Sequence, residues 1–123
     1  MDSNLLSAFL SACQQDPAML EFAKNRQVSL RFVLTDANLE FYLSFNNGEF
    51  KAALGAPPSN ADLTARTTAE IFDGLMSGKV NGTTAAMSGR LRFSGDTIKG
   101  MALQRVQKDM MRLYTQAKTS SEG

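Results

Sequence analysis

The chain has 123 residues, with 13 lysine and arginine residues against 12 aspartate and glutamate residues and a formal net charge of +1. That length suits a single domain with its own apolar core, and the near balance of charge, without basic runs, argues against a nucleic-acid partner. The sequence contains no histidine and one cysteine, Cys13, which excludes Ser-His and Cys-His catalysis, histidine-ligated zinc and an internal disulfide.

Motifs for other chemistry are also missing from the sequence. The glycines at Gly74 and Gly78 are too close together for a Walker A loop, and no GxGxxG pattern occurs. Most acidic residues stand at expected turns or helix starts, where capping is their ordinary role. We therefore expect no catalytic residue, no metal site, no cofactor and no enzymatic activity. Without a long apolar run or an N-terminal signal pattern, we expect a cytoplasmic protein.

The first segment, residues 3–24, carries apolar residues at the spacing of one helix face. Asp16-Pro17 interrupts it. Because proline is disfavoured inside a helix but favoured at its first position, the pattern predicts two short helices, with Asp16 capping the second.

Alternating apolar and polar residues predict three antiparallel strands over residues 28–54. Asn47-Gly48 is a strong hairpin signal, and an earlier turn precedes Leu39. Both turns place apolar residues opposite one another on one face of the sheet. The expected pairs are Phe45 with Phe50, Leu43 with Ala52, Phe41 with Leu54, Leu34 with Leu39, Phe32 with Phe41 and Val28 with Phe45.

Residues 55–60 are expected to form a loop and residues 61–66 a fourth strand. Thr67-x-x-Glu70 matches a capping box for a helix that ends at Gly78. A short helix over 81–87 and a fifth strand over 90–94 follow. The strand is expected to place Leu91 and Phe93 on one side.

Asp96 is expected to cap one long final helix. Its apolar stripe would be Ile98, Ala102, Val106, Met110, Leu113 and Ala117. Residues 118–123 are expected to form a flexible tail. Together these elements predict an α+β fold, in which helices cover the apolar face of a five-stranded, mainly antiparallel sheet. Residues 1–123 would then form one domain.

Residues 75–103 combine several glycines and methionines with no catalytic group, a pattern typical of small elements folded around something apolar. Three stretches within it, 75–81 (LMSGKVN), 85–93 (AAMSGRLRF) and 94–96 (SGD), resemble the sterol carrier protein type two family. The resemblance covers roughly residues 20–117. It implies a helix-covered sheet that encloses an apolar tunnel for sterols, fatty acids, acyl-CoA or phospholipids, without chemistry. The ending Ser-Glu-Gly is not a peroxisomal address, so that role of the family is not expected.

Apolar residues of the last helix, of 75–93 and of the sheet are candidates for the tunnel wall, and methionine suits such a wall because its side chain adapts to variable shapes. The alternative for each residue is an ordinary place in the core. The candidate ligand-binding residues are Phe32, Phe41, Leu75, Met76, Met87, Phe93, Met101, Val106, Met110 and Leu113. The candidates for head-group contacts are Arg66, Lys79, Arg90 and Arg92, for which a solvated surface role is the alternative.

The expected function is non-enzymatic binding and intracellular transfer of an apolar lipid, either a sterol or a fatty acyl compound. The alternative is an accessory or scaffold domain that supports a partner enzyme without a ligand of its own. The expected partners are the lipid and, transiently, a membrane or an enzyme. The sequence leaves a monomer and a homodimer open.

Overall fold

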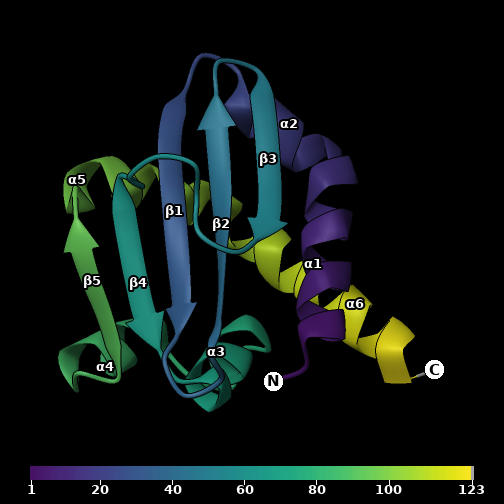
Figure 1. The fold of residues 1–123 in the computed structure, drawn as a ribbon, viewed down its shortest axis with the longest axis vertical. Coiled ribbons are helices and arrows are strands. Elements are labelled where there is room, and N and C mark those ends of the chain that lie inside the picture. Colours follow the sequence, from purple (N-terminus) through teal and green to yellow (C-terminus); the bar gives the residue numbers. More distant parts are fainter. Residues whose placement is uncertain (123) are drawn as a thin grey trace.

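A five-stranded sheet organises the computed structural model, which describes residues 1–122 (Figure 1). The strands are β1 (Gln27–Leu34), β2 (Leu39–Asn46), β3 (Glu49–Leu54), β4 (Leu63–Thr67) and β5 (Leu91–Gly95), in the order β3-β2-β1-β4-β5. Neighbouring strands run antiparallel except β1 and β4, which are parallel. The expected α+β class is confirmed, with a mixed and mostly antiparallel sheet.

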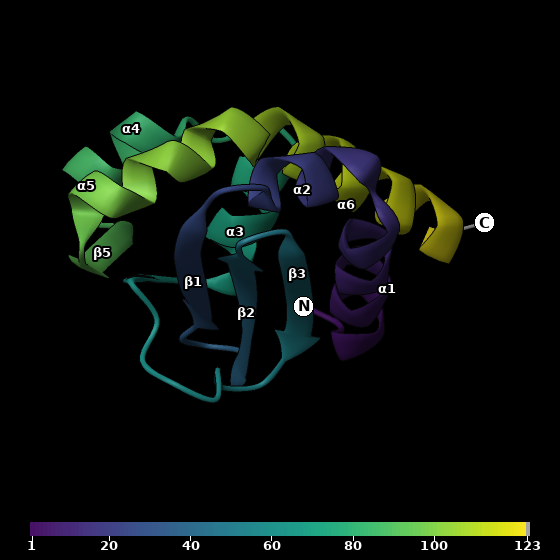
Figure 2. The same ribbon diagram turned by 90° about the horizontal axis from the view of Figure 1, so that it is seen from above.

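The helices gather over one face of this sheet, and α1 lies beside β3 (Figure 2). They are α1 (Ser3–Gln15), α2 (Pro17–Ala23), α3 (Ala69–Met76), α4 (Gly82–Met87), α5 (Thr97–Gly100), the 3-10 helix η1 (Met101–Val106) and α6 (Gln107–Glu122). The predicted break between α1 and α2 is confirmed, because the side chain of Asp16 accepts a hydrogen bond from the backbone N–H of Ala18.

The register of the three-stranded meander is as expected from its two turns. All six predicted cross-strand pairs occur, from Val28 opposite Phe45 to Phe41 opposite Leu54. Asn47 and Gly48 both have positive φ, at 50° and 96°, which a two-residue hairpin of type I′ requires. Local turn chemistry and side-chain alternation therefore determine this half of the sheet.

Five aromatic rings form the centre of the core, where α1, α3 and α6 meet the sheet. Phe41 stacks on Phe32 at 5.4 Å between ring centroids and contacts the edges of Phe9 and Phe72. Tyr114 joins Phe9 and Phe72, each at 5.6 Å. Edge-to-face pairs of this kind stabilise a core beyond the area that they bury.

The start of α3 differs from the expected capping box by one residue. Thr67 is still part of β4, and its hydroxyl donates a hydrogen bond to the carbonyl oxygen of Arg90 at 2.6 Å. Thr68 caps the helix instead, accepting from the N–H of Ile71. Glu70 then lies one position too early to complete a capping box. The fourth strand is likewise shifted relative to the expected 61–66, since it begins at Leu63.

The single long final helix was a wrong expectation. Asp96 does cap a helix, but α5 ends at Gly100 and a 3-10 segment precedes α6. Six residues with 3.0 per turn rotate the following helix by about 120° relative to a continuous α-helix. Ile98 therefore leaves the buried stripe and is 82% exposed, whereas Val106 and the later stripe residues are buried.

Helix α6 also extends over most of the segment that was expected to be a flexible tail, since it runs to Glu122. Gly123 lies outside the described residues. Lys118 donates to both carboxylate oxygens of Asp73 on α3, at 2.9 and 3.1 Å, and Tyr114 donates to the same carboxylate. Burial alone would raise the pKa of Asp73, but the hydrogen bonds from Lys118 and Tyr114 outweigh it and keep that pKa below its ordinary value. This network holds α3 and α6 together.

The free thiol of Cys13 gives a first testable prediction. Cys13 is fully buried in α1, and burial raises the pKa of its thiol to about 12, with the Asp16 carboxylate adding to the effect. Since only the thiolate is nucleophilic, iodoacetamide at pH 8 should leave native protein unmodified and should alkylate Cys13 fully after urea unfolding. Mass spectrometry of both samples checks this. Rapid alkylation of native protein would contradict the buried placement.

Candidate functional site

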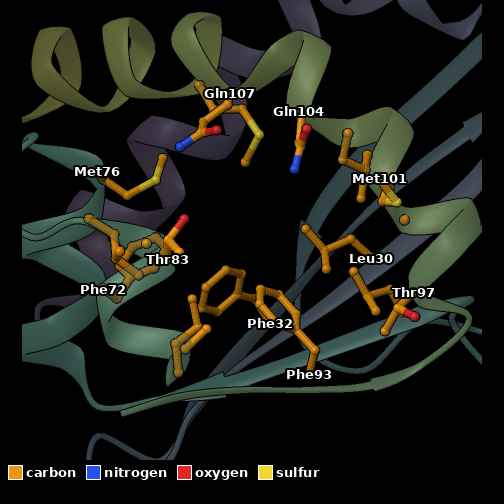
Figure 3. A pocket seen from close by; sticks show the side chains of 18 of the residues that line it. Leu30, Phe32, Phe72, Met76, Thr83, Phe93, Thr97, Met101, Gln104 and Gln107 are labelled. Carbon is orange, nitrogen blue, oxygen red and sulfur yellow. The ribbon is translucent and has the colours of Figure 1, made fainter. Parts of the chain in front are cut away.

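A cavity of about 610 Å³ lies between the sheet and the helices of the C-terminal half (Figure 3). Leu30 and Phe32 of β1, Leu63 of β4, and Leu91 and Phe93 of β5 form its sheet side. The volume falls within the range of about 300–1,000 Å³ that is usual for small-molecule sites. The cavity occupies the β1-β4-β5 half of the sheet, whereas α1 and α2 cover the other half.

Methionines and other apolar side chains form the helical walls of the cavity. On one side Phe72, Leu75 and Met76 of α3 meet residues of the short helix α4. On the other side Met101 of η1 faces them across the cavity (Figure 3), and Met110 of α6 also lines it. Flexible thioether side chains on opposing walls can adjust to ligands of different shape.

The polar groups of the cavity are few and uncharged. Figure 3 shows the amides of Gln104 and Gln107 pointing into the cavity from the η1–α6 side, with Thr83 opposite. Asn81 and Thr97 complete the polar lining. None of the lining residues is ionisable. The cavity therefore suits a ligand with an apolar body and one neutral polar group, such as a hydroxyl, an amide or a carbonyl.

The structure brings seven of the ten candidate residues together around this cavity. They are Phe32, Leu75, Met76, Met87, Phe93, Met101 and Met110. Phe41, Val106 and Leu113 do not line it, and all three are buried in the hydrophobic core. The alternation in β2 and the stripe on α6 indicate burial but not which buried residues border a space. Contact of the seven with a ligand stays a prediction.

Sequence reasoning missed the two glutamines. Gln104, Gln107 and Met111 all line the cavity and recur at the i, i+3, i+7 spacing of one helical face. Two polar residues on a helical face that also carries a methionine could have indicated that this face borders a cavity. The predicted apolar stripe lies mainly on a neighbouring face, where Val106, Leu113 and Ala117 pack into the core.

The basic residues considered for head-group contacts do not line the cavity. Arg66 donates to Ser94 across the strands, at 3.1 Å, and is exposed. Arg90 and Arg92 are also exposed, and they hydrogen-bond locally to Ser88 and Gly89. Lys79 is exposed as well. These positions fit the solvated surface role that was their alternative.

Within residues 1–122, no group of three or more cysteine, aspartate or glutamate side chains is placed to bind a metal ion. In the same part of the chain, no helix combines the length and apolarity needed to cross a membrane. The ion pairs include Asp73 with Lys118, which joins α3 to α6, and Asp109 with Arg112 within α6.

Comparison with known proteins agrees with this fold. The chain is 29% identical over 91 residues to hydroxysteroid dehydrogenase-like protein 2 of Xenopus tropicalis, which covers 73% of this chain but 22% of that protein. Two solved structures share the fold: sterol carrier protein 2 from Yarrowia lipolytica and the sec-alkylsulfatase Pisa1 from Pseudomonas sp..

The sterol carrier structure has a TM-score of 0.66 and 22% identity, and covers 87% of this chain and 89% of that one. The sulfatase has a TM-score of 0.62 and 21% identity, and covers 92% of this chain but 16% of that one. The chain thus spans a small part of the two longer proteins. The sequence pattern of the SCP-2 sterol transfer family matches residues 8–108. The chain therefore belongs to that family.

Proposed function

We propose that this chain binds an apolar lipid, a sterol or a fatty acyl compound, in the 610 Å³ cavity and transfers it without chemistry. The observation that carries the proposal is an apolar cavity, free of ionisable groups, in a member of a sterol transfer family. At about 0.8 kcal/mol per buried methylene, a dozen methylenes would contribute on the order of 10 kcal/mol before ordering costs. Affinity therefore needs no specific polar contact.

The two glutamines are the best candidates for orienting the lipid. Their amides can both donate and accept, which suits a sterol hydroxyl, a carboxyl group or an ester. Gln104 and Gln107 lie one turn apart and point into the same space (Figure 3). A ligand bound there would place its apolar body against Phe32 and Leu30 and its polar group towards the η1–α6 wall.

A cavity-filling variant tests the binding site directly. Gln107 is exposed on α6 yet points into the cavity, so Gln107→Trp should place an indole there without displacing a core residue. We expect uptake of a fluorescent fatty acid or sterol analogue by delipidated protein to fall by about tenfold or more, because an indole removes the space of several methylenes. Fluorescence titration measures the change.

Gln116→Trp is the matched control, because Gln116 is exposed on the same helix and does not line the cavity. It should bind like the unmodified protein, and both variants should keep the same melting temperature within a few degrees. Equal uptake by Gln107→Trp and Gln116→Trp would place the lipid elsewhere. Extraction and mass spectrometry of purified protein should in addition find a co-purifying lipid.

An accessory role is the second candidate. It is favoured by one observation, that the chain corresponds to 22% of a dehydrogenase-like protein and to 16% of an alkylsulfatase chain. In that case the domain would support an enzyme without a ligand of its own. Well-folded protein that takes up neither a fatty acid nor a sterol analogue, and yields no lipid on extraction, would favour this role over lipid transfer.

A further inference from the structure

We propose that the open edge of β5 binds an extended acidic segment of a partner protein, which joins the sheet as an additional strand. The inference goes beyond lipid binding and does not depend on it. Strand β5 is last in the order β3-β2-β1-β4-β5, and Figure 1 shows it at the outside of the sheet, with α4 and α5 at its two ends. An edge strand carries a row of backbone N–H and C=O groups that can pair with another chain.

The hydrogen bonds of β4 show which backbone groups of β5 point away from the sheet. The N–H of Thr35 donates to the carbonyl oxygen of Thr67 at 2.9 Å, so Thr67 directs its backbone groups towards β1. Thr67 is paired with Leu91 of β5, and backbone direction alternates along a strand. Leu91 and Phe93 therefore direct their N–H and C=O groups towards the open edge. Within residues 1–122, no other element supplies a hydrogen-bond partner to these groups.

The opposite edge of the sheet is closed. Ala52 of β3 also directs its backbone N–H away from the sheet, and this N–H donates to the side-chain Oε1 of Gln14 on α1 at 3.0 Å. Helix α1 packs beside β3 along the same edge. The chain thus protects one edge strand from pairing with other chains and leaves β5 without such a cover.

Two arginines make the β5 edge basic on the face of the sheet that the helices leave uncovered. Arg66 of β4 and Arg92 of β5 stand directly opposite one another in the register, and both are exposed. Like charges in such a pair destabilise a sheet. Their side chains donate hydrogen bonds to neutral oxygens, of Ser94 and of Gly89, and within residues 1–122 neither arginine forms an ion pair. A carboxylate placed beside them would relieve this repulsion.

The side chains of β5 define the pattern of the bound segment. Phe93 lies on the helix side of the sheet and is 48% exposed, whereas Arg92 lies on the opposite face. A strand added beside β5 would place its own side chains alternately next to these two residues. The partner that fits is therefore an extended segment in which acidic and apolar residues alternate. A second copy of β5 fits poorly, because two-fold pairing would gather Arg66 and Arg92 of both copies on one face.

Binding of a synthetic peptide to the full chain, followed by NMR of the backbone amides, tests the proposal. The probe is a capped peptide of about seven residues in which glutamate and valine alternate, long enough to span β5. At saturating peptide we expect the amide signals of Leu91 and Phe93 to shift and their hydrogen exchange to slow by about tenfold, because their N–H groups gain a partner. The same peptide with N-methylated backbone nitrogens should bind about tenfold more weakly, since it cannot complete the ladder.

Charge reversal tests the role of the arginines. Arg92→Glu should weaken binding of the glutamate peptide by about tenfold and should allow binding of the corresponding lysine–valine peptide, which the unmodified protein should not bind. Lys51→Glu is the matched control, because Lys51 is an exposed basic residue of the other edge strand, β3, and it should leave both affinities unchanged. Both variants should keep the melting temperature of the unmodified protein and should take up a fluorescent fatty acid normally, since neither residue lines the cavity.

Four outcomes overturn the proposal. They are no peptide binding, equal binding of the glutamate and lysine peptides, amide shifts at β3 instead of β5, and equal effects of Arg92→Glu and Lys51→Glu. Concentration-dependent shifts of Leu91 and Phe93 without peptide would assign the edge to a second copy of the chain and also overturn it. Lipid uptake is measured on the same samples. Normal uptake without peptide binding refutes this inference alone, whereas peptide binding without uptake refutes the proposed lipid transfer alone.

Discussion

Replacing Phe41 by alanine should destabilise the protein by about 3–5 kcal/mol, the usual cost of removing a buried aromatic side chain. Phe41 is 0% exposed and touches three rings, Phe9, Phe32 and Phe72, which belong to α1, β1 and α3. No neighbouring side chain can refill a space bounded by other rings. Since small domains are stable by about 5–15 kcal/mol, urea unfolding should show a large fall in the midpoint.

Phe93→Ala is the matched comparison, because it removes a phenylalanine that borders the cavity and not one from the core. Phe93 is also a sheet phenylalanine and was also a candidate site residue, but it is half-exposed and borders the cavity. Its removal should cost less than about 1 kcal/mol in stability and should weaken lipid uptake. For Phe41→Leu, which keeps the core filled, uptake should stay close to normal. Similar stability losses for Phe41→Ala and Phe93→Ala would contradict the division between core and cavity.

Gly95→Ala should have the second large effect on stability. Gly95 ends β5 with φ at +104°, where a side chain costs about 1–3 kcal/mol in backbone strain. A Cβ there would also lie 2.4 Å from the carbonyl oxygen of Asp62, a rigid backbone atom. That oxygen accepts a hydrogen bond from the N–H of Asp96, the cap of α5, so the clash also disturbs the start of the helix beside the cavity. Thermal melting should therefore show a larger loss of stability than backbone strain alone would cause.

Gly55→Ala is the control that separates the cost of backbone strain from the cost of a steric clash. Gly55 has φ at +98°, close to that of Gly95, but a Cβ there would meet no atom within 4 Å. Its loss of stability therefore measures the backbone term, and the excess for Gly95→Ala measures the contact with Asp62. Equal melting temperatures for the two variants would show that the close approach of β5 to Asp62 is relaxed at little cost.

Local rules predicted much of this fold because their effects are contained in short segments. The Asn47-Gly48 turn needs two residues with positive φ, and the alternation from Val28 to Leu54 allows one register only. Pro17 and Asp16 similarly determine where α1 stops and α2 starts. None of these features depends on distant parts of the chain.

Other expectations failed where a distant contact outweighed a local preference. Thr67 matches a helix cap by spacing, but its hydroxyl donates to the carbonyl oxygen of Arg90, just before β5, and Thr68 caps the helix instead. Periodicity extends the last helix through Ile98, yet Gly100 packs on Leu63 so closely that a Cβ would lie 2.6 Å away from its side chain. The 3-10 segment that follows rotates the apolar face of α6 relative to that of α5, so Ile98 is no longer in line with the buried residues of α6.

The sequence alone determined the fold class, the register of β1 to β3, the absence of histidine chemistry and an apolar interior, because composition and periodicity report which residues avoid water. Only the tertiary structure decided which of those residues border empty space. Phe41 and Phe32 stand opposite each other in one register, but Phe41 is enclosed by rings while Phe32 also faces the cavity. A cavity is a difference between the volume that surrounding elements enclose and the volume that side chains fill, and that difference arises only when β1, α3, α4 and α6 are assembled.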